Sequence, residues 1–532
     1  MPFTAWLVSS LSRIFPWTPS PRDLASPPLE IARNERFAFQ AAFRLTEEQP
    51  AKVQASISGP QGWQFRVRRV GYVPVMHYNS DVPPEHQEGA LPGFVPDPLF
   101  DETEFELARR ETHAFWFSVV PDPETPPGKH SLTVTLECQG KAHHLTATVT
   151  VRDVLIERRR DFRVTNWFYN DALLDFHDCS AWDERYWMVL ENYFTNLAAH
   201  GQDTIYTPVF TPPLDGVKRP SQLLHVTERA EGEYEFDWTQ VERYVKLARK
   251  CGLDHFEWSH LFTQWGVAHA LRIYHGHGTD ERLLWDPETP ATGEVYRSFL
   301  SQFLPQLKQF VKRHKLMDCS FFHLSDEPHE QHVPAYKAAR ELLRELAPWM
   351  QVMDALSHVE FARDGLTDIP VPVTNAALDF VAEDIPSWVY YCCVPRGRYI
   401  QRLLDTPLSQ IRMNGWTFYR WPFQGFLHWG LNYWYQSGSR TKIDPFMTQD
   451  GKRWPTWAFG DPFMIYPGAD GPIDSIRWEV FGHSLQDYAM LQSQGIARES
   501  KLLEPIHAFD DFPRDEAWLN ATRHIIFGGE KG

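Results

Sequence analysis

The first 160 residues alternate apolar and polar positions over short stretches. A period of two is typical of β-strands with one buried face. The alternation predicts strands at residues 37–45, 53–57, 63–67, 114–119, 131–136 and 145–151. Because turn residues separate these stretches, we expect a β-sandwich domain over residues 1–160. The proline-rich residues 82–98 are expected to form a long loop.

After the charged run at residues 157–161 the pattern changes to alternating strands and helices. Strands are predicted at residues 162–168, 204–210, 255–262, 320–324, 351–356, 371–376, 388–394 and 426–434. Apolar spacing near 3.6 predicts helices at 181–200, 238–251, 294–314, 333–347, 398–411, 473–492 and 518–527. Eight such alternations indicate a (β/α)8 TIM-type barrel with C-terminal helices over residues 161–532. A doubly wound open sheet is the alternative, but no Gly-x-Gly-x-x-Gly follows a strand to support it.

One predicted strand ends in two adjacent acids. Residues 319–324 are apolar and aromatic, and the chain continues with Ser325, Asp326, Glu327 and Pro328. Neighbouring strand residues normally point to opposite faces, but at a strand's end both acids can face one site. In a barrel this end lies at the catalytic face. The simpler explanation, in which Asp326 caps the next helix and Glu327 is solvated, is equally compatible with this stretch alone.

Polar and aromatic residues also follow the other predicted strands. They are Asn166, Trp167, Tyr169, Glu257, Trp258, His260, Trp265, Asn375, Tyr390, Tyr391, His428, Trp429, Asn432 and Trp434. Any one of these side chains is readily explained by the core. Their shared position at one end of a barrel favours a carbohydrate pocket, since Trp and Tyr rings stack on the apolar faces of sugars.

The seventh predicted strand bears on the reaction type. Most retaining glycosidases use two separate carboxylates, and on this barrel the nucleophile follows strand seven. Residues 388–395 contain no Asp or Glu. In substrate-assisted hydrolysis the 2-acetamido oxygen of the sugar attacks C1 instead. One carboxylate then orients the acetamido nitrogen and a second protonates the leaving oxygen, which suits the adjacent pair Asp326 and Glu327.

Composition excludes several classes of function. A net charge of −17 makes nucleic acid an unexpected partner. The six cysteines lack metal-type spacing and are typical of reduced thiols. We expect no metal, no organic cofactor and no membrane span. Because Met1 to Thr4 do not begin a signal peptide, the expected location is cytoplasmic.

The chain resembles glycoside hydrolase family 123, the retaining β-N-acetylgalactosaminidases. The similar stretches are residues 32–40, 166–168, 200–201, 207–213, 256–260, 325–328, 425–434, 460–461, 466–468 and 475–480. The resemblance implies an N-terminal β-sandwich, a (β/α)8 catalytic domain and substrate-assisted hydrolysis through an oxazoline. It also implies that Asp326 stabilises the oxazoline and that Glu327 is the acid/base.

The predicted function is therefore an exo-acting enzyme that removes terminal β-GalNAc from a glycan or glycolipid. Candidate substrate-binding residues, taken from their positions near strand ends or in the similar stretches, are Glu257, Trp258, Trp265, Asn375, Tyr390, Trp429, Asn432, Trp434 and Tyr466. Two alternatives stay open. One is a two-carboxylate glycosidase of other sugar specificity, with Asp354 or Asp326 as nucleophile. The other is a non-catalytic carbohydrate-binding protein. A homo-oligomer is compatible with the sequence, which does not distinguish GalNAc from GlcNAc.

Overall fold

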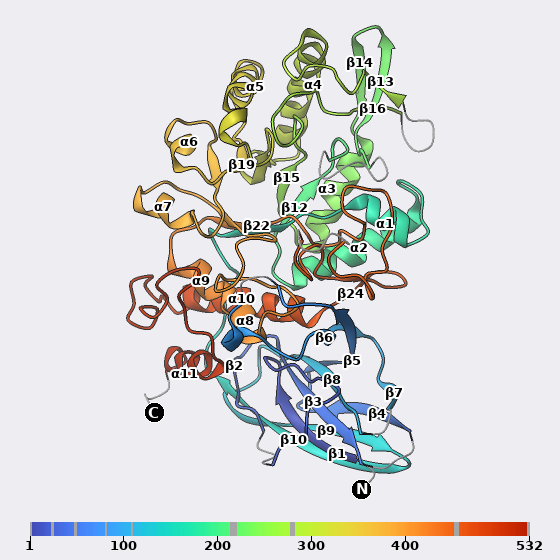
Figure 1. Cartoon of the computed structure of the whole chain (residues 1–532), viewed down its shortest axis with the longest axis vertical. Helices are drawn as coiled ribbons and strands as arrows, with labels where there is room; N and C mark the ends of the chain where they lie inside the picture. Colours follow the sequence, from blue (N-terminus) through green and yellow to red (C-terminus); the bar gives the residue numbers. More distant parts are fainter. Residues whose placement is uncertain are drawn as a thin grey trace.

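The computed structural model describes residues 3–22, 26–46, 50–79, 82–107, 110–212, 221–276, 282–451 and 457–528. An all-strand N-terminal part lies at one end of the molecule, and a part that alternates strands and helices lies at the other (Figure 1). Helix α10 (Ile476–Ser493) lies at the junction between them (Figure 1).

Two five-stranded sheets make up the N-terminal part. The first has the order β1-β3-β8-β5-β6, formed by β1 (Phe3–Ser9), β3 (Phe37–Leu45), β8 (Thr112–Val120), β5 (Gln64–Val75) and β6 (Gly93–Phe100). The second has the order β2-β10-β9-β4-β7, formed by β2 (Leu29–Ala32), β10 (Lys141–Arg152), β9 (Gly128–Cys138), β4 (Ala51–Ser58) and β7 (Glu104–Leu107). All pairs are antiparallel except β10 with β2. Each of the six strands predicted here coincides with or overlaps one of these strands.

The predicted long loop at residues 82–98 is wrong in its second half. Strand β6 begins at Gly93 and pairs with β5 even though it contains Pro96 and Pro98. Proline lacks the amide hydrogen that a ladder needs, but it is tolerated on an edge strand, and β6 is the edge of its sheet. The proline content therefore indicated the position of the strand in the sheet, and not its absence.

The first sheet is buried on both faces. In β3, Phe37, Phe39 and Phe43 pack into the core shared with the second sheet. The alternate residues Ala38 and Ala42 belong to the core of the other half of the molecule. Because successive side chains of a strand point to opposite faces, one strand contributes to both cores. The sheet therefore packs against the remaining chain as one layer of a larger structure.

Each of the eight predicted strands of the second part overlaps a shorter observed strand, although the sixth, predicted at residues 371–376, shares only Val371 with it. The observed strands are β11 (Arg163–Asn166), β12 (Thr204–Thr207), β15 (His255–Trp258), β18 (Ser320–Phe322), β19 (Met353–Ala355), β20 (Ile369–Val371), β21 (Val389–Tyr390) and β22 (Gly425–His428). They form parallel sheets of order β11-β22-β21, β12-β15-β18 and β19-β20. Isolated parallel bridges join Phe322 to Val352 and Val373 to Tyr390. The amide of Asp203, just before β12, donates to the carbonyl of Val164 in β11 at 3.3 Å. Closure into one barrel stays a prediction.

Helices connect most of these strands and lie outside them (Figure 1). The longer ones are α2 (Glu184–Ala199), α3 (Thr239–Cys251), α4 (Glu294–Arg313), α5 (Val333–Leu346), α10 and α11 (Glu516–Ile526). The shorter ones are α1 (Asn170–Phe176), α6 (Val359–Arg363), α7 (Ala377–Ala382), α8 (Leu408–Arg412) and α9 (Asn414–Arg420). Among the described residues, none of the helices has the length and apolar character needed to cross a bilayer.

Two features differ from the prediction. The helix expected over residues 398–411 is reduced to α8, which begins after Pro407, since proline cannot continue a helix from the preceding turn. The sequence pattern also missed a small sheet of β13 (His225–Ala230), β14 (Glu233–Asp237), β16 (Tyr274–His275) and β17 (Arg282–Leu283), and the hairpin of β23 (Tyr466–Pro467) and β24 (Pro472–Ile473). Their strands are mostly too short to show a period.

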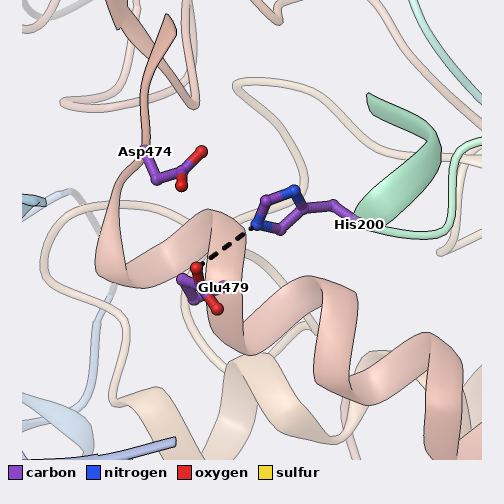
Figure 2. Close-up of side chains that lie close together, drawn as sticks. All are labelled: His200, Asp474 and Glu479. Carbon is purple, nitrogen blue, oxygen red and sulfur yellow. Dashed lines mark ion pairs between the residues drawn. The ribbon is translucent and has the colours of Figure 1, made fainter. Parts of the chain in front are cut away.

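A buried ion-pair network joins the two parts of the molecule. Arg68 of β5 is fully buried and donates to Asp474 and to Glu479 of α10, each at 2.5 Å. His200 lies 3.5 Å from the same Glu479, and Figure 2 shows the three side chains His200, Asp474 and Glu479 facing one another. These three could form a metal-ligand set, but the guanidinium of Arg68 already compensates both carboxylates. The cluster is therefore explained as an ion-pair network.

The same charges make the junction sensitive to acid. Burial alone raises the pKa of Glu479, but the nearby guanidinium groups of Arg36 and Arg68 lower it well below its ordinary value of 4.5. A carboxyl group with a depressed folded-state pKa stabilises the fold above its unfolded pKa, and this stabilisation is lost as the pH falls through the folded value. The junction is therefore expected to lose stability progressively as the pH falls below about 4.5, and the loss is complete only when the pH falls below the folded-state pKa.

We expect Arg68→Met to destabilise the protein strongly. The substitution leaves two buried carboxylates without their cation, and breaking a buried pair in this way costs about 3–5 kcal/mol. The matched control is Lys52→Met, because the pair of Lys52 with Glu104 is exposed and such pairs contribute at most about 1 kcal/mol. Thermal unfolding at pH 7 measures both. Equal midpoints for the two variants would contradict the role given to Arg68.

Candidate active site

The adjacent acids follow β18, as the sequence predicts, and a local backbone turn separates them. Glu327 has a φ of +42°, in the left-handed region that few side chains other than glycine adopt. Such conformations persist only where the surroundings fix them, and they are frequent at functional sites. Here the carbonyl of Asp326 accepts from the amide of Trp265 at 3.2 Å. The turn allows the neighbouring carboxyl groups of Asp326 and Glu327 to face the same cavity.

Both acids line one cavity of about 200 Å³. Its wall is mainly aromatic and sulfur-containing, and its described lining residues are Trp167, Tyr169, Gln264, Trp265, Asp326, Glu327, Ala355, Tyr390, Cys392, Cys393, Leu427, Trp429 and Trp457. They come from the ends of six of the eight parallel strands and from the segments that follow these strands. A small, largely apolar cavity with a few converging polar groups is the usual form of a ligand site.

The two acids differ in their surroundings. Asp326 is buried, and burial together with the charge of Glu327 raises its pKa well above the ordinary value. Glu327 is half-buried and accepts a hydrogen bond from the Tyr390 hydroxyl at 2.7 Å. Burial and the neighbouring Glu327 raise the pKa of Tyr390, so that it remains a phenol and a donor. Two like charges this close disfavour the doubly ionised form of the pair.

A buried histidine lies beneath the acid pair. The Nε2 of His323 is 2.6 Å from Glu257, and its Nδ1 is 3.2 Å from Asp354. Burial alone lowers the pKa of His323, but hydrogen bonds and charges from Asp354 and Glu257 raise it to about 10. His323 is therefore an imidazolium at neutral pH. Its positive charge lowers the pKa of Asp326, against the larger effects of burial and Glu327.

The carboxylates on either side of His323 also hold parts of the site in place. Glu257 accepts hydrogen bonds from Trp167 at 2.5 Å and from Thr165 at 2.6 Å. Because the Trp167 ring lines the cavity, Glu257 fixes part of its wall. Asp354 accepts from the amide of Leu324 at 3.1 Å and from Tyr336 at 2.5 Å, so it fixes the backbone that leads to the acids.

Five of the predicted site residues meet at the cavity. They are Asp326, Glu327, Trp265, Tyr390 and Trp429. Trp265 is 52% exposed and has a φ of +56°, so its ring is held at the cavity edge by an unusual backbone conformation. The indole of Trp429 donates to Asp461 at 2.8 Å, which orients the other side of the wall.

The other six predicted site residues lie outside the cavity lining. Glu257 is buried beneath it, Trp258 stacks on Phe322 in the core, and Asn375 is exposed elsewhere. Asn432 does not line the cavity, but it hydrogen-bonds both the amide and the carbonyl of Tyr169, which does.

Trp434 and Tyr466 are fully buried core residues. Trp434 donates to the carbonyl of Ile465 at 3.0 Å, and Tyr466 donates to Asp97 of β6 at 2.6 Å. Position near a strand end therefore did not distinguish side chains that face the cavity from those that face the surrounding layers.

Several lining residues were not predicted as site residues. Trp167 and Tyr169 lie at the end of the first predicted strand, and this position was the sequence feature that could have identified them. Trp457 and Gln264 come from long connecting segments, where no periodicity predicts which way a side chain points. Cys392 and Cys393 followed the seventh strand, and reduced thiols are not typical sugar ligands.

Comparisons with known proteins agree with this geometry. The model of the glycoside hydrolase 123 catalytic domain matches residues 167–494, which is more than half of the chain. A family 123 glycoside hydrolase from Clostridium perfringens, whose structure was analysed for glycolipid glycan hydrolysis, is similar in fold. The similarity covers 99% of this chain and 98% of the other, with a TM-score of 0.75 and 12% identity.

Other matches add little. A β-glucuronidase from Parabacteroides merdae is matched over 85% of this chain and 50% of its own, with 10% identity and a TM-score of 0.33, which is too slight to bear on the fold. No curated protein matches the sequence. From the family match and the fold it shares with the clostridial enzyme, we conclude that this chain belongs to glycoside hydrolase family 123 and is a glycoside hydrolase.

Proposed function

We propose that the protein is a retaining exo-β-N-acetylgalactosaminidase that works by substrate-assisted catalysis. The observation that carries this proposal is the cavity that Asp326 and Glu327 share. Among its described lining residues no third carboxylate occurs that could serve as an enzyme nucleophile. An attacking oxygen supplied by the substrate's own 2-acetamido group fits this arrangement.

The two acids would then have separate roles. Asp326 accepts a hydrogen bond from the acetamido N–H, which orients the carbonyl oxygen toward C1 and stabilises the positive charge of the oxazoline. Glu327 gives its proton to the leaving oxygen and later takes one from the attacking water. Tyr390 donates to Oε1 of Glu327, which leaves the other oxygen for this proton. As the substrate N–H approaches Asp326, hydrogen bonding favours its charged form and leaves the shared proton on Glu327.

The fold proposed for this enzyme is a β-sandwich, residues 1–160, followed by a (β/α)8 barrel, residues 161–532. The parallel pairings and bridges of β11 to β22 support closure, because they connect the eight strands in chain order and return from β22 to β11. In such a barrel the acids would lie at the carboxyl ends of the strands, where catalytic residues of this fold occur.

The proposed substrate is a terminal β-GalNAc residue of a glycan or glycolipid. A cavity of about 200 Å³ suits one sugar ring better than an internal segment of a chain. Trp167, Trp265, Trp429 and Trp457 offer apolar faces for the ring and the acetamido methyl group. The clostridial relative's link to glycolipid glycans supports the same substrate class.

The two-carboxylate alternative finds no support at Asp354. This residue is fully buried, does not line the cavity, and its oxygens accept from Tyr336, His323 and the backbone. Its position suits a support for the site and not a nucleophile.

We predict that Glu327→Gln and Asp326→Asn both lose hydrolysis, but with different substrate dependence. Loss of a general acid costs about 10²–10⁴-fold. A dinitrophenyl β-GalNAc needs little protonation when it leaves, so Glu327→Gln should recover most activity on it, compared with a simple alkyl glycoside. Asp326→Asn should stay impaired on both, because it acts on the acetamido group. Steady-state kcat/KM values on the two substrates test this, and equal recovery in the two variants would contradict the assigned roles.

Hydrolysis should require the acetamido group. We expect the wild-type protein to cleave an aryl β-GalNAc and to leave the matching aryl β-galactoside, which has a hydroxyl at C2, essentially uncleaved. A GalNAc-thiazoline should inhibit competitively, since it mimics the oxazoline. Comparable rates on the two aryl glycosides would overturn substrate assistance.

We predict that His323→Gln moves the acid limb of the pH–rate profile to higher pH. The imidazolium lowers the pKa of Asp326, so its loss raises that pKa, and the ionised form needed for catalysis is reached at a higher pH. Asp354→Asn removes a negative charge that raises the same pKa, and should move the limb to lower pH. The profile of kcat/KM between pH 4 and 8 measures both shifts. A uniform loss at every pH in both variants would indicate a purely structural role.

A further inference from the structure

Two neighbouring cysteines form part of the wall beside the acids. After β21 the chain passes Tyr391 and reaches Cys392 and Cys393, whose sulfur atoms lie 3.9 Å apart. Both line the cavity that contains Asp326 and Glu327. None of the six cysteines forms a disulfide, and the other four, Cys138, Cys179, Cys251 and Cys319, lie outside this lining.

Hydrogen bonds to its backbone hold the segment that carries the pair in place. The amide of Cys392 donates to the carbonyl of Val394 at 3.1 Å. The buried side chain of Gln401 donates to the carbonyls of Cys392 at 2.7 Å and Pro395 at 2.8 Å. The two thiols are therefore presented to the cavity by a braced turn.

The geometry favours chelation over a disulfide. The Cα atoms of adjacent residues are about 3.8 Å apart, whereas disulfides usually join Cα atoms about 4.4–6.8 Å apart, so a bond between these two would be strained and easily reduced. A hydrogen bond with Cys393 and burial raise the pKa of the Cys392 thiol well above its ordinary value. The thiol of Cys392 is therefore protonated at neutral pH and is a poor target for reagents that need a thiolate. A soft atom bound by both sulfurs avoids the strain of a direct bond.

We propose that Cys392 and Cys393 form a dithiol site that binds a trivalent arsenical, and that an occupant of this site blocks the cavity. With phenylarsine oxide the step is a condensation. Each sulfur forms a bond to arsenic, the arsenic–oxygen bond breaks, and the two thiol protons leave with the oxygen as one water. Arsenic stays trivalent, so no oxidant or reductant is needed. The bound group would lie next to Tyr390 and Glu327 and exclude a sugar.

Intact-protein mass spectrometry tests the site directly. The full-length protein is treated with one equivalent of phenylarsine oxide in excess glutathione, which competes for arsenic bound by a single thiol. We expect one phenylarsenic group per chain, removed by ethanedithiol. The adduct should be absent in Cys392→Ser and in Cys393→Ser, and retained in Cys251→Ser, which changes a thiol outside the cavity. No stable adduct on the wild-type protein, or an adduct that survives in either of the first two variants, would overturn the proposal.

An activity assay tests whether an occupant of the dithiol site blocks the cavity. This part of the proposal rests on the proposed function. Hydrolysis of aryl β-GalNAc by the wild-type protein and by Cys251→Ser should fall at least tenfold as the adduct forms, and should return with ethanedithiol. Hydrolysis that continues unchanged in a fully modified sample would refute blockage of the cavity. If the untreated protein cleaves no such sugar, the proposed function fails, while the mass measurement still decides whether the dithiol site exists.

Discussion

The site depends on two carboxyl groups held next to each other at the end of one short strand. Adjacent residues in an extended strand point apart, so this arrangement requires the left-handed backbone of Glu327. Proximity and burial then disfavour two charges, and the raised pKa of Asp326 expresses that constraint. A pair that resists losing its second proton is what a general acid needs. Backbone conformation, charge and chemistry are therefore linked at this one turn.

The surrounding structure keeps this turn in place. His323 is held between Glu257 and Asp354 and places a buried positive charge near the acids. Glu257 also fixes part of the cavity wall through Trp167, and Asp354 fixes the backbone that leads to the acids. Farther out, Arg68 ties α10 to the N-terminal sheet through Asp474 and Glu479. The N-terminal part thus contributes to the core on which the strands rest, although none of its described residues lines the cavity.

Much of this could be predicted from the sequence, because the responsible signals are local. The alternation at residues 37–45 gave the bounds of β3, and seven of the eight strands of the second part were recognisable in place, whereas β20 was predicted too far along the chain. The acid pair was recognisable because Asp326 and Glu327 directly follow an apolar run. The direction of single side chains was not recognisable from the sequence. Trp434 and Tyr466 face core layers, and Glu257 bonds His323 and Trp167. These orientations depend on contacts with residues far away in the chain, so a local pattern does not predict them.

The central claim is that the sugar's own acetamido oxygen is the nucleophile and that an oxazoline is the intermediate. Proton NMR of the protein mixed with synthetic GalNAc-1,2-oxazoline and water tests this most directly. The account predicts that the wild-type protein accelerates oxazoline opening and releases β-GalNAc as the first anomer, and that Asp326→Asn does not accelerate it. Oxazoline that decays at the rate seen in buffer alone, with a wild-type sample that cleaves aryl β-GalNAc, would contradict the account.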